Sequence, residues 1–291
     1  MTSERWPDFV IIGAMKCATS TLHVQLAAQP GFWMSNPKEP NFFSDPEQWA
    51  KGLDWYKGLF AGAGAVDLCG ESSTHYTKLP DLPDALPRVA EYLPDARFIY
   101  VMRHPIDRLV SHFIHGWSKR DMDGPIEDAV KRHPALVDYG RYAMQITPWI
   151  ERFGQDKVLP VFFERLTAHP QAEFERICAF LGYAGAPVWR PDLRDNVSEQ
   201  RMRSSPLRDA IVKNPLATFL RRTFVPQAMR DRIKSQWQMR ERPELSAEAR
   251  AGLETLFDPD LARLGAMLGT PLSCATFKET VRARSLEWAR N

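Results

Sequence analysis

Four short apolar segments, separated by helical patterns, constrain the fold of this chain more than any other feature. The clearest is Arg-Phe-Ile-Tyr-Val-Met at residues 97–102, and the others lie at residues 9–12, 65–70 and 158–163. Short runs rich in β-branched and aromatic residues are typical of the strands of a parallel sheet that is buried on both faces. The predicted fold class is therefore α/β, a three-layer parallel sheet flanked by helices.

Helical patterns follow three of these segments, at residues 19–29, 106–117 and 172–181. Residues 246–268 predict one or two amphipathic helices, with Pro259 marking the break between them. In folds of this class, ligands bind at the carboxyl ends of the strands. The residues that directly follow each strand are therefore the first candidates for a functional site.

The alternation of strands and helices fails between residues 191 and 243, a stretch with many arginines and lysines and several prolines. This stretch is either a cap over a substrate or nucleotide, or an irregular or helical cap that binds nothing. We expect it to belong to a single domain covering residues 1–291, since no internal repeat or low-complexity linker divides the chain.

The formal net charge of the chain is +2, which argues against a surface that coats a polyanion, so no nucleic-acid partner is expected. The cysteines are scattered and lack the spacing of zinc ligands, which favours reduced thiols. No apolar run approaches the roughly 20 residues of a membrane span, and the first residues lack the pattern of a signal peptide. We expect a cytoplasmic protein without a membrane span, and the sequence does not indicate its oligomeric state.

The loop after the first strand, residues 13–21, combines small residues, Lys16 and three consecutive hydroxyls. Helix N-termini carry unpaired backbone N–H groups and partial positive charge, so such a loop suits a phosphate or sulfate group. On this segment alone, a strand-to-helix turn with a capping hydroxyl and an exposed lysine is an equal alternative.

The same loop differs from the P-loop of nucleotide triphosphatases, whose pattern is GxxxxGK[ST]. Here no Gly-Lys pair exists, and Lys16 precedes the first hydroxyl, Thr19, by three residues. In P-loop proteins an acidic residue at the end of a later strand holds Mg²⁺. The clearest later strand of this chain is followed by Arg103 instead, which predicts a phosphorylated ligand that is held without a metal ion.

Arg103 and Ser111 form a second candidate anion site at the start of the predicted helix after residues 97–102. An arginine fork with a hydroxyl suits a phosphate group. The alternative is a structural ion pair between Arg103 and Asp107.

These segments resemble the PAPS-dependent sulfotransferases, particularly bacterial enzymes similar to the heparan-sulfate and other carbohydrate sulfotransferases. Lys16-Cys-Ala-Thr-Ser-Thr-Leu22 looks like the family's 5'-phosphosulfate loop, and Arg103 and Ser111 have the spacing of its 3'-phosphate motif. Lys38-Glu-Pro-Asn-Phe-Phe43 resembles its KExxFF segment. The resemblance implies the sulfotransferase variant of the P-loop NTPase fold. It also implies 3'-phosphoadenosine 5'-phosphosulfate (PAPS) as co-substrate, 3'-phosphoadenosine 5'-phosphate (PAP) as product, no metal, and a small-molecule or carbohydrate acceptor.

The resemblance also implies roles for single residues. Lys16 is expected to stabilise the leaving group and Glu39 to act as the general base, with His75 as the rival base. The residues expected to hold the donor are Lys16, Cys17, Ala18, Thr19, Ser20, Thr21, Arg103 and Ser111. Arg201 or Arg203 is expected to complete the 3'-phosphate site, and the alternative for both is a solvated run of charge.

Two positions depart from the family pattern. Ala18 stands where the family usually has glycine, and Ser72 stands where many carbohydrate sulfotransferases have lysine. Ser72 therefore puts a carbohydrate acceptor in doubt. Two other functions compete with sulfuryl transfer: an ATP-dependent kinase of small molecules, and a non-catalytic module that binds a nucleotide or a partner protein.

Overall fold

A central sheet of five parallel strands organises the computed structural model, which describes residues 5–193 and 242–289. The strand order is β2-β3-β1-β4-β5, and every neighbouring pair is parallel. The strands are β1 (Phe9–Gly13), β2 (Phe32–Met34), β3 (Leu68–Ser72), β4 (Arg97–Met102) and β5 (Val158–Phe162). The predicted parallel α/β sheet is confirmed.

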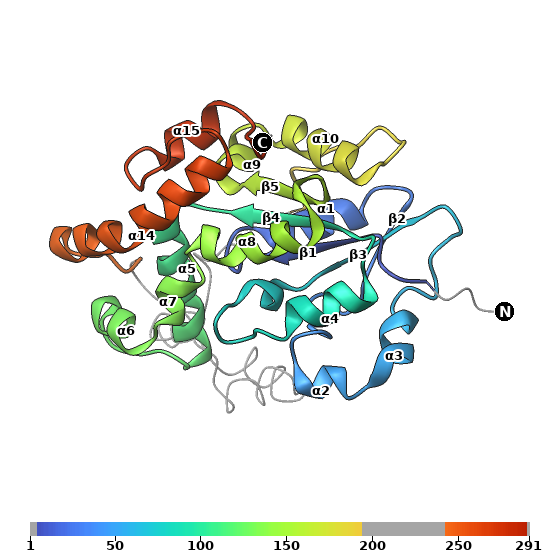
Figure 1. Ribbon diagram of the computed structural model, residues 1–291, viewed down its shortest axis with the longest axis horizontal. Coiled ribbons are helices and arrows are strands. Elements are labelled where there is room, and N and C mark those ends of the chain that lie inside the picture. Colours follow the sequence, from blue (N-terminus) through green and yellow to red (C-terminus); the bar gives the residue numbers. More distant parts are fainter. Residues whose placement is uncertain (1–4, 194–241, 290–291) are drawn as a thin grey trace, which may run out of the picture.

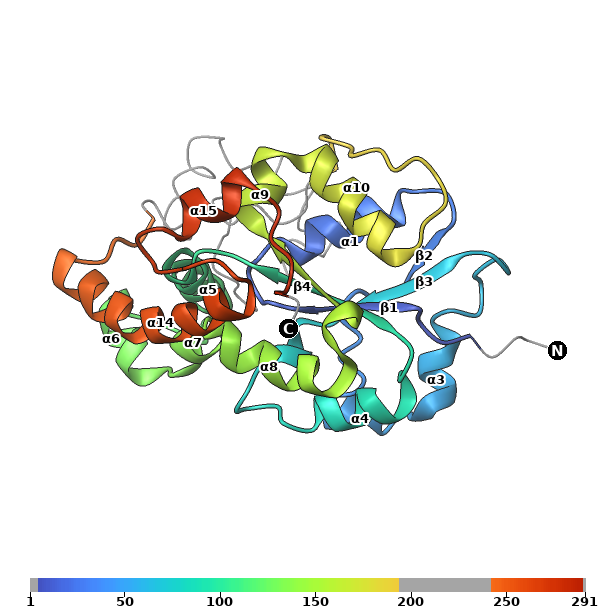
Figure 2. The ribbon, with the colours of Figure 1, turned by 45° about the horizontal axis from the view of Figure 1, so that its top comes forward.

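Helices cover both faces of this sheet and give the molecule three layers (Figures 1 and 2). Helices α1 (Thr19–Ala27) and α10 (Pro170–Leu181) lie on one face, and α4 (Ala85–Tyr92) and α8 (Tyr142–Phe153) lie on the other. Helix α5 (Pro105–Lys119) continues from β4. The shorter helices are α2 (Pro46–Trp49), α3 (Gly52–Gly58), η1 (Thr74–Thr77), α6 (Ile126–Arg132), α7 (Ala135–Asp138), η2 (Gln155–Lys157), α9 (Phe163–Ala168) and α15 (Phe277–Ala283).

The third strand begins later than the sequence predicts, at Leu68 instead of residue 65. A turn occupies the preceding residues: the Asp67 carboxylate accepts a hydrogen bond from the Gly64 N–H (2.6 Å), and the Asp67 N–H donates to the Gly64 carbonyl (3.1 Å). Val66, inside this turn, is 92% exposed. An apolar residue at a loop tip therefore caused the error in the predicted strand.

Helix α14 (Ala247–Met267) passes through Pro259 without interruption, so of the one or two predicted helices the structure has one, and the break at Pro259 is wrong. Proline inside a helix costs about 3 kcal/mol because it removes one hydrogen bond and crowds the preceding turn. Leu253 and Phe257 on one side of the proline and Leu261 on the other are all buried in the same core. Shared burial on both sides stabilises the continuous helix.

Aromatic packing anchors the segment between β2 and α2. Phe42 stacks on Tyr56 with ring centroids 4.7 Å apart, and Phe43 meets Tyr56 edge-on at 5.0 Å. Both phenylalanines are fully buried. The apolar half of the KExxFF-like segment thus fixes the position of its charged half, Lys38 and Glu39.

The expected basic cap at residues 191–243 lies almost entirely outside the described residues, and so do Arg201 and Arg203. In the two described ranges, no helix combines the length and apolar character that a membrane span requires.

Candidate functional site

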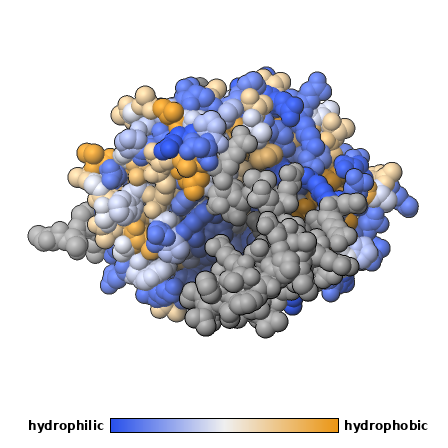
Figure 3. All heavy atoms as spheres, turned by 180° about the vertical axis from the view of Figure 1, so that it is seen from behind, coloured by the Kyte–Doolittle hydropathy of each residue, from blue (hydrophilic) through white to orange (hydrophobic). Residues whose placement is uncertain are grey.

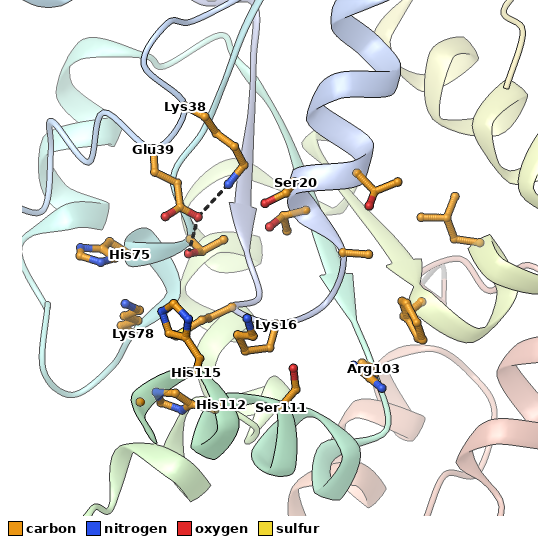
Figure 4. Close-up of a pocket in the computed structure, with 18 of the residues that line it drawn as sticks. Lys16, Ser20, Lys38, Glu39, His75, Lys78, Arg103, Ser111, His112 and His115 are labelled. Carbon is orange, nitrogen blue, oxygen red and sulfur yellow. Dashed lines mark hydrogen bonds and ion pairs between the residues drawn. The ribbon is translucent and has the colours of Figure 1, made fainter. Parts of the chain in front are cut away.

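A cavity of about 740 Å³ opens at the carboxyl ends of the central strands (Figure 4). Its walls come from the loop after β1, from η1 after β3, from the end of β4 and from α5. It brings together most of the residues that the sequence nominated, namely Lys16, Ala18, Thr19, Ser20, Thr21, Glu39, His75, Arg103 and Ser111. Hydrophilic residues also border a hollow on the face opposite the view of Figure 1 (Figure 3).

The loop after β1 delivers backbone N–H groups to this cavity. Helix α1 begins at Thr19, and its N-cap residue is Ala18, a residue whose side chain cannot accept a hydrogen bond. The alternative of a turn capped by a hydroxyl is therefore not what the structure shows. The hydroxyl of Ser20 faces the space beside Lys16 (Figure 4), at the N-terminus of α1, where helices carry a partial positive charge that favours anions.

Cys17 turns away from the cavity, unlike Lys16 before it and residues 18–21 after it. Its side chain is fully buried, and its Sγ lies 3.8 Å from the hydroxyl oxygen of Tyr142. Burial raises the pKa of the Cys17 thiol to about 12, although the nearby Arg108 and Arg103 act in the opposite direction. The thiol is therefore protonated and belongs to the core, which leaves only the backbone of Cys17 for the predicted contact with the donor.

Ala18 adopts the left-handed conformation, with φ 66° and ψ 22°. This region favours glycine because a Cβ atom there crowds the following carbonyl, at about 1–2 kcal/mol. This conformation explains why the family that the chain resembles usually has glycine at the position of Ala18.

Replacing Ala18 with glycine is expected to raise the free energy of unfolding by up to about 1 kcal/mol, because relief of the strain exceeds the added entropy of the unfolded chain. Urea denaturation of the wild type and Ala18→Gly measures this difference. As a control, Ala251→Gly at an exposed position inside α14 should destabilise the protein by roughly 1 kcal/mol. A loss of stability in Ala18→Gly would contradict the strain described at this position.

Arg103 directly follows β4, and its guanidinium carbon lies 4.5 Å from the ring centre of Phe163. Its Nε atom is buried and has no hydrogen-bond partner among the described residues. Asp107 pairs with Lys278 at 2.6 Å, and among the described residues no ion pair joins it to Arg103, so the structure does not show the alternative of an Arg103–Asp107 ion pair. Arg103 therefore keeps donors available for a ligand, with Ser111 of α5 facing the same space (Figure 4).

Glu39 lies on the opposite side of Lys16 from Arg103 (Figure 4). The Lys38 ammonium donates to its carboxylate at 2.9 Å, and the Thr74 hydroxyl donates at 3.1 Å. Burial raises the pKa of Glu39, but the charge of Lys38 and both hydrogen bonds outweigh burial and lower the pKa below its usual value. Glu39 also has φ 57°, a strained conformation of the kind that clusters at functional sites.

His75 lies at the same side of the cavity as Glu39, within η1. Burial and the neighbouring Lys78 lower the pKa of His75 to about 4. Both candidate bases are thus in their proton-accepting forms at neutral pH.

Several residues of the cavity were not singled out from the sequence. They are Thr74, Lys78, His115 and Lys119. They lie on segments distant in the chain, so only the fold brings them together.

His112 also lines the cavity, where burial and then Arg108 lower its pKa to about 2. Ser72, in contrast, is buried and bonded to His23 Nδ1 at 2.9 Å.

The described residues include no group of three or more His, Cys, Asp or Glu side chains placed to hold a metal ion. The fold and the cavity define a class: an α/β protein with a cavity at the carboxyl ends of its strands, lined by cations and hydroxyls that suit an anionic ligand.

Comparison with known proteins narrows this class. Residues 62–187 match the model of the sulfotransferase family, a range that includes Arg103 and Ser111. Heparan sulfate glucosamine 3-O-sulfotransferase 3B1 of Mus musculus is 29% identical over 189 residues, covering 62% of this chain and 47% of that protein. Bifunctional heparan sulfate N-deacetylase/N-sulfotransferase 2 of Homo sapiens is 28% identical over 203 residues, covering 62% of this chain and 22% of that protein. This chain therefore spans about half the length of the first relative, and less of the second.

Among solved structures, a sulfotransferase from Alicyclobacillus acidocaldarius superimposes with a TM-score of 0.65 at 23% identity, covering 92% of this chain and 98% of that one. This likeness shows that the fold is the sulfotransferase fold. With the matches in sequence, it makes the chain similar to members of the sulfotransferase family over much of its length.

Proposed function

We propose that this protein transfers a sulfuryl group from PAPS to a hydroxyl or amine of an acceptor. One observation carries the proposal: a single cavity holds Lys16, Arg103 and Ser111 on one side and the carboxylate of Glu39 on the other. The first group suits the two phosphates of the donor. The carboxylate suits the deprotonation of an acceptor.

The reaction is an in-line displacement at sulfur. The acceptor atom forms a bond to sulfur while the bond between sulfur and the 5'-phosphate oxygen of the donor breaks, and PAP leaves with the bonding electrons. Lys16 stabilises the charge that develops on the leaving oxygen. Glu39 takes the proton of the acceptor, and the hydrogen bonds from Lys38 and Thr74 orient its carboxylate. His75 is the alternative base.

The part of the cavity around Glu39 and His75, which we call the acceptor side, favours a polar acceptor. Its lining includes Lys78, His115 and Lys119 beside Glu39 and His75. The hydroxyls of a sugar or of another polar small molecule suit these charged and polar groups, whereas a purely apolar acceptor offers them no hydrogen bond. The curated relatives are named for heparan sulfate, which supports a carbohydrate acceptor, and Lys78 offers a cation although Ser72 replaces the family's lysine. We also keep the cytoplasm as the proposed location, because all four cysteines are free thiols.

Binding of nucleotides in solution tests the function. PAP is expected to raise the melting temperature of the protein clearly more than AMP or ATP does, with or without Mg²⁺, because only PAP offers a 3'-phosphate to Arg103 and Ser111. A kinase would instead respond mainly to ATP with Mg²⁺, a result that would sink the proposal. A non-catalytic module would bind PAP but fail to transfer label from ³⁵S-PAPS to any acceptor of a broad panel.

A further inference from the structure

The hydroxyl of Tyr142 forms hydrogen bonds with both backbone polar groups of Arg103. The side chain comes from the first residue of α8 and is fully buried. Its O–H donates to the Arg103 carbonyl at 2.6 Å, and its oxygen accepts from the Arg103 N–H at 3.2 Å. One distant side chain therefore satisfies both backbone polar groups of the residue at which the chain leaves β4.

The same oxygen also lies 3.8 Å from Sγ of Cys17, in the loop that carries Lys16. Tyr142 thus touches both loops that face the donor. Burial raises the pKa of Tyr142 well above its ordinary value, so the hydroxyl keeps the proton that it donates. The side chain of Tyr142 does not line the cavity, so it acts there only through the loops that it contacts.

The position of Tyr142 is fixed in turn by α14. The buried carboxylate of Asp260 accepts hydrogen bonds from the N–H groups of Ala143 (2.9 Å) and Met144 (3.0 Å), in the first turn of α8. The residue at the N-cap of α8, Arg141, makes no capping hydrogen bond through its side chain among the described residues. Asp260 therefore supplies the cap from a helix more than one hundred residues away in the chain.

We propose that Tyr142 is a positioning residue for the 3'-phosphate of the donor: it holds the backbone of Arg103 so that the guanidinium meets that phosphate. This inference rests on the proposed function. The direction of the Arg103 side chain follows from its backbone, and small displacements of a charged clamp weaken a bidentate contact strongly. A general effect on folding would weaken all nucleotides alike, whereas loss of this bridge should weaken only those with a 3'-phosphate.

The test compares PAP with AMP, which lacks the 3'-phosphate, by calorimetry on the full chain. Tyr142→Phe should raise the Kd for PAP about tenfold, since two buried backbone groups lose their partner, and should leave the Kd for AMP unchanged. Arg103→Ala is the reference variant, in which the preference for PAP over AMP should be lost completely. The matched control is Tyr100→Phe: Tyr100 is fully buried with its ring centre 6.1 Å from that of Tyr142, and its hydroxyl has no hydrogen bond to Arg103 or Cys17 among the described residues.

Retention of the wild-type preference for PAP in Tyr142→Phe would overturn the inference and leave the proposed function intact. An equal loss of both affinities in Tyr142→Phe would also overturn it, because that pattern indicates a purely structural role. If Tyr100→Phe lost the preference for PAP over AMP as Tyr142→Phe does, the inference would also be overturned, because the effect would not depend on the bridge to Arg103. A wild-type protein without any preference for PAP over AMP would overturn the proposed function, and this inference with it.

Discussion

Replacing Glu39 with glutamine is expected to lower kcat at saturating donor by about 10²- to 10⁴-fold, the usual contribution of a positioned general base. The substitution keeps the shape of the side chain and an oxygen that can accept hydrogen bonds from Lys38 and Thr74. It removes the negative charge and the ability to take a proton. The Kd for PAP should change little, because Glu39 lies on the acceptor side of Lys16.

Two comparisons give this result its meaning. Glu47→Gln, on an exposed residue in the first turn of α2, controls for the loss of one carboxylate and should retain full activity. His75→Ala reports on the rival base and should lower kcat far less than Glu39→Gln does. Equal activity of Glu39→Gln and wild type would remove Glu39 from the mechanism, and a larger loss in His75→Ala would assign the base to His75.

The pH dependence of kcat at saturating donor follows from the same base. Lys38 and Thr74 hold the pKa of Glu39 below its usual value, although burial opposes them. The carboxylate is therefore ionised above that low pKa, and activity should be lost only as the pH falls through it. We expect no acid limb in kcat near pH 6.5, the ordinary pKa of histidine. A limb with that midpoint would point to a histidine base whose pKa is not lowered.

Replacing Lys16 with alanine is expected to lower kcat by about 10²- to 10³-fold, comparable to the removal of one preorganised donor from an oxyanion site. Lys16 lies between the acceptor side and Arg103 (Figure 4), where the bond between sulfur and the leaving phosphate oxygen would lie. Arginine at this position retains the charge but replaces a compact ammonium by a planar fork, so Lys16→Arg should recover only part of the activity.

Lys131→Ala is the matched control, since Lys131 is an exposed lysine on α6 outside the cavity. It removes the same charge and should leave kcat and the KM for PAPS near their wild-type values. An activity of Lys16→Ala within threefold of wild type would contradict the role given to Lys16. A rise in the KM for PAPS with unchanged kcat in Lys16→Ala would indicate that Lys16 binds the donor in the ground state and does not stabilise the transition state further.

The sequence predicted those parts of the fold and site that depend on local patterns. Strand β4 and the loop at Lys16 were predicted because a short apolar run and the polar residues behind it are adjacent in the chain. The carboxyl ends of parallel strands meet at one edge, so residues after different strands could be expected in one site. The short strand β2 and the turn at Asp67 were missed, because neither has a strong periodicity of its own.

Contacts between distant residues could not be predicted in this way. The bridge from Tyr142 to Arg103 and the cap from Asp260 to α8 join residues tens to more than one hundred positions apart. The continuity of α14 through Pro259 likewise depends on burial against the rest of the core. The roles of Arg201 and Arg203 stay predictions, since both residues lie outside the described part of the chain.

Transfer of label from ³⁵S-PAPS tests the central claim most directly. The protein is incubated with the donor and a panel of sugars, phenols, lipids and amines, in parallel reactions with EDTA and with Mg²⁺. We predict that label appears on at least one polar acceptor, that one PAP is released for each label transferred, and that Glu39→Gln and Lys16→Ala lose this transfer. Absence of transfer to every acceptor, together with phosphate transfer from ATP in the presence of Mg²⁺, would contradict the claim.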